Sequence, residues 1–112
     1  MILEQVELPG DILKLKLLGS LDIAGSEQID TPLAVIAGKA NRVIVDFGAV
    51  TFLASIGIRL IVKAARAITN RGGKLVIYNP NFDARKVLRS TGIDAIIPVV
   101  TDEPSALAEC AK

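Results

Sequence analysis

Residues 42–58 read RVIVDFGAVTFLASIGI and form the most informative part of the chain. Its first part, Arg42 to Phe47, is a short run rich in β-branched residues, which is typical of a strand buried in the middle of a sheet. The next part, Gly48 to Ala54, is expected to be a loop that delivers the chain to Ser55. Apolar residues then recur at helical spacing. The stretch therefore predicts a buried strand, a loop and a helix whose N-cap is Ser55.

The helix predicted from Ser55 has two different faces. We expect it to stop at Asn70 or Arg71, because Gly72-Gly73 can supply a left-handed C-terminal cap. The apolar face should pack on the sheet and consists of Leu60, Ile61, Ala64, Ala65 and Ile68. The polar stripe consists of Arg59, Lys63, Arg66 and Asn70. Because Ser55 lies one turn before Arg59 on this stripe, its hydroxyl should point outward, where an enzyme can reach it.

Two strands and a helix are predicted before this stretch. Apolar and polar residues alternate around Val6 and again over Leu13–Leu17, with turn residues at Leu8-Pro9-Gly10-Asp11 between them, which predicts a β-hairpin. From Gly25 to Ala40 the apolar positions have helical spacing, and Pro32 interrupts them. A kink or a late helix start is expected at this proline.

Strands and helices continue to alternate after it. We predict a buried strand over Lys74–Tyr78, a helix over Phe82–Thr91, an edge strand over Ile96–Val100 and a final helix from Asp102. The order ββαβαβαβα predicts an α/β fold with one domain over residues 1–112, in which a mixed, largely parallel sheet is covered by helices. The predicted core residues are Val43, Val45, Leu75 and Ile77, and Arg59, Lys63 and Arg66 should be exposed.

Composition excludes several classes of function. The 13 basic residues are balanced by 12 acidic ones, so the chain lacks the basic surface typical of nucleic-acid binding. The absence of histidine excludes imidazole base catalysis and histidine-ligated zinc. Cys110 is the single cysteine and favours a reducing compartment. No signal peptide and no apolar run of the ~18 residues of a membrane span is visible, so we expect a cytoplasmic protein without cofactor or direct membrane insertion.

Three short motifs resemble those of the STAS domain, the family of the anti-sigma factor antagonists. Residues 46–58 resemble its signature loop, in which a strand end is followed by Val, an aromatic, an aliphatic, Asp or Ala, Ser, a variable residue and Gly. Gly19-Ser20-Leu21-Asp22 resembles the family's Gly-x-Leu-Asp, and residues 87–94 resemble its later helix with a Gly-aliphatic turn. The resemblance spans about Ile12 to Cys110 and rests on the order and spacing of the motifs.

The resemblance implies a sheet covered by helices on one side and a partner-switching role. In such systems the unphosphorylated antagonist binds an anti-sigma factor that is also a serine kinase, and so frees a sigma factor. Phosphorylation of the signature serine, here Ser55, blocks this binding, and a serine phosphatase restores it. The implied partner-binding residues are Asp22, Ala54, Ser55, Ile56, Gly57, Arg59 and Lys63.

Two residues depart from the family pattern. Ala54 stands where Asp is frequent, which removes an acid that could contribute to kinase contact. Ile56 stands where Ser is frequent, which leaves Ser55 as the only hydroxyl on the helix tip. Simpler roles are also open: Ser55 as a plain cap, Asp22 as a turn residue, and the basic stripe as a solvated helix face. Asp46 is expected to anchor the loop by hydrogen bonds.

Three functions of different classes remain open at this point. The first is the phospho-regulated binding module. The second is an enzyme with Ser55 as nucleophile, which lacks an activating base because there is no histidine and Lys63 lies two turns away. The third is a constitutive interaction or scaffold subunit of a stress-signalling or transport complex, in which Ser55 is never phosphorylated. No local feature supports nucleotide binding.

Overall fold

The computed structural model describes all residues from 1 to 112. Strands and helices alternate after an N-terminal hairpin, in the predicted order. The strands are β1 (Ile2–Leu8), β2 (Ile12–Leu21), β3 (Arg42–Leu53), β4 (Lys74–Tyr78) and β5 (Val99–Val100). The helices are α1 (Ile23–Lys39), α2 (Ser55–Asn70), α3 (Phe82–Ser90) and α4 (Glu103–Cys110), with a short 3-10 turn at Ile93–Ala95. None of these helices combines the length and the apolar character that crossing a membrane requires.

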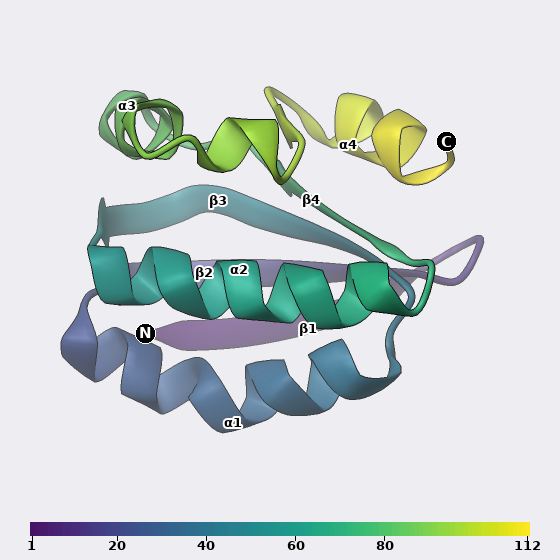
Figure 1. Ribbon diagram of the computed structural model, residues 1–112, viewed down its shortest axis with the longest axis horizontal. Helices are drawn as coiled ribbons and strands as arrows, with labels where there is room; N and C mark the ends of the chain where they lie inside the picture. Colours follow the sequence, from purple (N-terminus) through teal and green to yellow (C-terminus); the bar gives the residue numbers. More distant parts are fainter.

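The five strands form one sheet in the order β1-β2-β3-β4-β5 (Figure 1). β1 and β2 are antiparallel, and every later pair is parallel, as the sequence predicted. Residues of α1, α2 and α3 join the main core on one face of the sheet. The other face is covered in part by α4, which packs Ala106 and Cys110 on Ile44 and Val76. The resemblance implied that helices cover only one side of the sheet. This expectation is wrong, because the second face of the sheet is also apolar and α4 packs on it.

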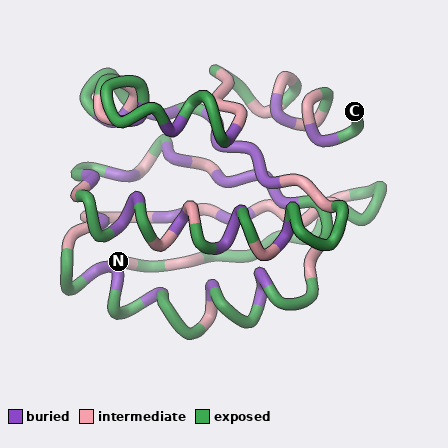
Figure 2. The backbone as a smooth tube through the Cα atoms, in the orientation of Figure 1, coloured by how far each residue is buried: buried purple, intermediate pink, exposed green.

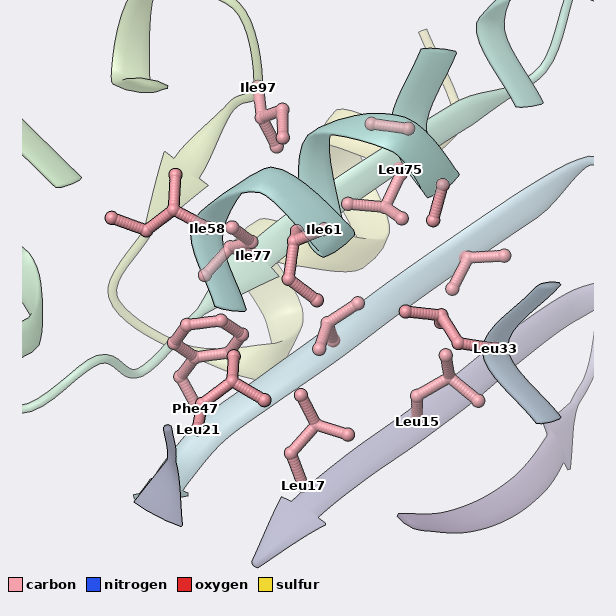
Figure 3. Close-up of a cluster of buried hydrophobic side chains, with 14 of the residues drawn as sticks. Leu15, Leu17, Leu21, Leu33, Phe47, Ile58, Ile61, Leu75, Ile77 and Ile97 are labelled. Atoms are coloured by element: carbon pink, nitrogen blue, oxygen red, sulfur yellow. The ribbon is translucent and has the colours of Figure 1, made fainter. Parts of the chain in front are cut away.

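Side chains of the central strands alternate between these two cores. Val43, Val45, Leu75 and Ile77 point to the main core and are at most 3% exposed, which confirms their prediction as core residues. Figure 3 shows Leu75 and Ile77 gathered with leucine and isoleucine side chains from β2, α1 and α2. Each such side chain stabilises the fold by roughly 1.5–3 kcal/mol when it is fully buried.

β3 is longer than the sequence predicted. The segment from Gly48 to Leu53 continues the strand, so the loop expected over Gly48–Ala54 is wrong. The register between β2 and β3 shifts at two points, because β3 has one extra residue at each of them. The buried residues Phe47, Val50 and Leu53 are consequently three apart instead of two, which hides the strand pattern. At the first irregularity Asp46 Oδ1 accepts a hydrogen bond of 2.8 Å from Gly48 N, which confirms its anchoring role.

α1 begins earlier than the sequence predicted. Asp22 is its N-cap, and the helix runs from Ile23 through Pro32 to Lys39, so the expected late start at the proline is wrong. The cap explains the early start, because Asp22 Oδ1 accepts a hydrogen bond of 2.7 Å from Gly25 N.

α2 has the predicted length and the predicted faces. It ends at Asn70, and Gly72 has a left-handed φ of 83°, as a glycine-terminated helix requires. Figure 2 shows buried and exposed positions alternating along it. Arg59, Lys63 and Arg66 are exposed, which confirms their prediction. β5 lies at the edge of the sheet as predicted, but it is only Val99–Val100, because Ile93–Ala95 forms a 3-10 turn and Pro98 precedes the strand.

Candidate functional site

The ends of β2 and β3 bring two helix starts together. Leu21, the last residue of β2, is paired with Leu53, the last residue of β3. Ala54 N then donates a hydrogen bond of 3.0 Å to Leu21 O. α1 and α2 therefore begin side by side at one edge of the sheet (Figure 1). This places the predicted residue Asp22 next to the Ala54–Gly57 segment.

Ser55 is exposed at this edge, as predicted, but it does not cap the helix. The N-cap is Ala54, which has an extended backbone (φ −97°, ψ 165°), and Ser55 is the first helical residue. No side chain accepts a hydrogen bond from the first-turn amides of α2. Ser55 Oγ itself makes no hydrogen bond within the protein, in contrast to Asp22 and Asn81, whose side chains cap α1 and α3. The expected capping role of Ser55 is wrong, and its hydroxyl is left free.

Gly57 fixes how the tip of α2 sits on the sheet. It is buried, and a Cβ added to it would lie 2.5 Å from Leu21 Cγ and 2.7 Å from Leu21 O. Gly57 therefore allows the first turn of α2 to lie close to the end of β2. Its predicted part in partner binding would be indirect, through the position that it gives to Ser55 and Ile56.

Exposed apolar side chains accompany Ser55 at the same edge. Ile56 is 40% exposed, Phe52 is 57% exposed and Ile23 is 68% exposed. We call the surface formed by Asp22, Ile23, Phe52 and Ala54–Ile56 the Ser55 edge. Ile23 and Phe52 are not recognisable as site residues from the sequence, because the local pattern predicts a loop at Phe52 and a helix that begins after Ile23. Three large exposed apolar side chains close to the ends of β2 and β3 make this edge a candidate protein-binding surface.

The basic residues Arg59 and Lys63 extend the site along α2. Both are exposed, and neither forms an ion pair within the protein. Together with Ile56 they line a depression of about 170 Å³ between α1 and α2, whose opposite wall holds Glu27 and Asp30. Arg66 is exposed but does not line it. The structure thus brings Arg59 and Lys63 to the side of α2 that faces α1.

A separate polar cluster ties α4 to the sheet. Burial, followed by the charge of Asp46 and by the hydrogen bond to Glu103, raises the pKa of Tyr78 well above its usual value. Tyr78 Oη donates a bond of 3.1 Å to Glu103 Oε1, and Lys14 Nζ lies 2.8 Å from the same oxygen. The hydrogen bond from Lys14 is the main cause of a lowered pKa of Glu103. The cluster thus links Lys14 of β2 and Tyr78 of β4 to Glu103 in the first turn of α4.

Known proteins share both the sequence pattern and the fold. BtrV of Bordetella bronchiseptica, a candidate anti-sigma factor antagonist, is 29% identical over 93 residues, which cover 82% of this chain and 80% of BtrV. An anti-sigma-factor antagonist (STAS) domain protein of Planctomyces limnophilus superposes with a TM-score of 0.83 at 23% identity, over 98% of both chains. The phosphorylated form of the Bacillus cell fate determinant SpoIIAA gives a TM-score of 0.75 at 19% identity, over 99% of this chain and 100% of SpoIIAA.

The structural likenesses establish the fold, and the sequence comparison adds the family. A family model described as "STAS domain" matches residues 5–106, which is nearly the whole chain. The matched range contains both sequence motifs of the Ser55 edge. The chain therefore belongs to the STAS domain family.

Proposed function

We propose that this protein is an anti-sigma factor antagonist that binds an anti-sigma factor through the Ser55 edge and loses this binding when Ser55 is phosphorylated. The anti-sigma factor would act as the serine kinase, and a serine phosphatase would restore the binding form. The protein would act by binding rather than by catalysis. The name of BtrV supports the partner class, and the phosphorylated state known for SpoIIAA supports the kind of regulation.

The observation that carries this proposal is the free hydroxyl of Ser55. A serine at the N-cap of α2 would already use its hydroxyl as an acceptor for the amides of the first turn. Ser55 holds no such bond, because Ala54 occupies the cap position. It is also exposed, so that a kinase can reach it without unfolding the helix. Its apolar neighbours Ile23, Phe52 and Ile56 give a partner the contact area that a serine alone lacks.

A phosphate on Ser55 fits the electrostatics of this helix end. The amides of the first turn carry a partial positive charge and have no side-chain acceptor. Arg59 lies four residues on, on the same side of α2, and can pair with the phosphate. The added charge of about −1.5 to −2 would therefore be tolerated by the fold and would act on the partner surface.

Site mapping on protein purified from its own cells tests the proposal. Intact-mass measurement and fragmentation should find one phosphate, on Ser55, in a fraction of the molecules. Proteins that co-purify with the unphosphorylated fraction should include an anti-sigma factor of the serine-kinase class. A phosphate on another residue, or a partner that binds both fractions equally, contradicts the proposal and favours a constitutive scaffold.

A further inference from the structure

A continuous groove between α1 and α2 leads away from the Ser55 edge. It consists of two depressions of about 170 and 150 Å³ that share Asp30, Leu60 and Lys63. We call them together the α1/α2 groove. Its near half begins at Ile56, in the first turn of α2, and its far half reaches Gly38 near the end of α1. A cavity of about 150 Å³ can hold one benzene molecule, so each half has room for one apolar side chain.

A polar atom without a partner lies at the floor of the near half. Ser26 is 4% exposed and lines this depression, and its Oγ is the one buried side-chain oxygen or nitrogen without a hydrogen bond. Leaving a buried hydroxyl unpaired costs about 1–3 kcal/mol. Because the Oγ itself is enclosed, a group bound in the groove can pair with it only when the Ser26 side chain turns toward the groove, and that hydrogen bond would remove the cost.

The rim of the groove carries charges of both signs. Glu27 and Asp30 stand on α1, whereas Arg59 and Lys63 stand on α2. None of the four forms an ion pair, although they line the same depression. A ligand of one charge sign would be repelled by one wall. The arrangement instead suits a segment that has a basic flank toward α1 and an acidic flank toward α2.

The far half has an apolar floor of small residues. Ala34, Ala37, Ala64 and Ala67 line it with Leu33, and the small side chains leave space between the two helix backbones. The two halves are centred roughly seven residues apart along α1 and roughly four along α2, which is about 10 Å and about 6 Å at 1.5 Å per residue. Residues i and i+4, or i and i+7, of a helix laid along the groove share one face and have these separations.

We propose that the α1/α2 groove is the second part of the partner surface and receives an amphipathic helix of the anti-sigma factor. Two apolar side chains of that helix, four or seven residues apart, fill the two halves. A polar group beside the first of them pairs with Ser26 Oγ, and its charged flanks face the rim. This inference rests on the proposed function, because it takes the occupant from the same partner that contacts Ser55.

Blocking the groove tests the inference. The probe is the purified serine-kinase anti-sigma factor of the same genome that binds the wild-type chain, measured by calorimetric titration. Ala34→Phe fills the far half from an exposed position and should weaken binding by at least about tenfold. Val35→Phe is the matched control, because Val35 is also exposed on α1 but does not line the groove. It should bind within about twofold of wild type.

Removing the floor hydroxyl is the second variant. Ser26→Ala should keep or raise the melting temperature, because an unpaired buried hydroxyl is lost, and should weaken binding by about two- to tenfold. If Ser55→Asp abolishes binding while Ala34→Phe and Ser26→Ala both bind like wild type, the groove proposal is overturned and the proposed function stands. If no such anti-sigma factor binds the wild-type chain, both are overturned.

Discussion

Gly57 and Leu21 are in direct contact, and a Cβ on Gly57 would lie only 2.7 Å from the carbonyl oxygen of Leu21. The same carbonyl oxygen accepts the hydrogen bond from Ala54 N. The first turn of α2 is therefore held on the end of β2 by both contacts. This relationship sets the height of Ser55 above the sheet, and it connects the stability of the fold to the geometry of the site.

Gly57→Ala should destabilise the protein. Helix propensity alone would favour alanine by about 1 kcal/mol, but overpacking against Leu21 costs about 1–3 kcal/mol, so the free energy of unfolding should fall. Gly38→Ala is the matched control, because Gly38 is an exposed glycine of α1 with no atom within 4 Å of an added Cβ. It should raise the free energy of unfolding by about 0.5–1 kcal/mol. Urea denaturation measures both, and a stable Gly57→Ala protein would contradict the contact.

Ala54→Asp should stabilise α2. Ala54 has the extended backbone of an N-cap but no side-chain acceptor, and an aspartate there can accept a hydrogen bond from the first turn. The expected gain is about 1 kcal/mol in the free energy of unfolding. Asn81→Ala removes the existing cap of α3, which accepts a bond of 2.7 Å from Ala84 N, and also the bond of 3.0 Å from Asn81 Nδ2 to Val50 O, so it should lose more than about 1 kcal/mol. Equal melting of Ala54→Asp and wild type would show that α2 does not begin at Ser55.

Asp22→Asn separates the capping role of Asp22 from its charge. The asparagine can still accept the hydrogen bond from Gly25 N, so stability should stay close to that of wild type, whereas Asp22→Ala should lose about 1 kcal/mol. A loss of partner binding in Asp22→Asn would then measure the contribution of the negative charge of Asp22 to binding. Thermal melting and binding titration of both variants separate the two roles. If Asp22→Ala melts at the wild-type temperature, the Asp22 cap does not stabilise α1.

The ionisation of Tyr78 should be coupled to unfolding. Tyr78 is the only tyrosine, there is no tryptophan, and its folded-state pKa is raised, chiefly by burial. The stability that comes from keeping the phenol neutral is present below the unfolded pKa of about 10 and is lost as the pH rises above it. Absorbance titration should therefore show tyrosinate appearing together with unfolding, at a higher pH than in urea. The same midpoint in both conditions would mean that Tyr78 is not buried.

The regular parts of the fold were readable from the sequence. Val43, Val45, Leu75 and Ile77 lie in uninterrupted buried runs, and the polar stripe of α2 has a helical period, so local pattern and tertiary packing agree. The sequence did not reveal the end of β3, because its extra residues turn the two-residue alternation of a strand into a spacing of three at Phe47, Val50 and Leu53.

The candidate site was predicted only in part for the same reason. Ser55 was found through its motif and its place on the polar stripe, but its cap role depended on where β3 ended, and the longer strand moves that role to Ala54. The α1/α2 groove depends on how two helices pack. No single segment encodes it, and Ser26 stands out only once its surroundings are known.

Binding of Ser55→Asp to the anti-sigma factor, measured beside its thermal melting, distinguishes a phosphate-regulated surface from a constitutive one. Ser105→Asp is the control, because it places the same charge in the first turn of α4, which packs on the other face of the sheet. We expect Ser55→Asp to melt at or slightly above the wild-type temperature and to bind at least about tenfold more weakly, whereas Ser105→Asp should bind like wild type. Wild-type affinity of a folded Ser55→Asp protein would contradict this expectation.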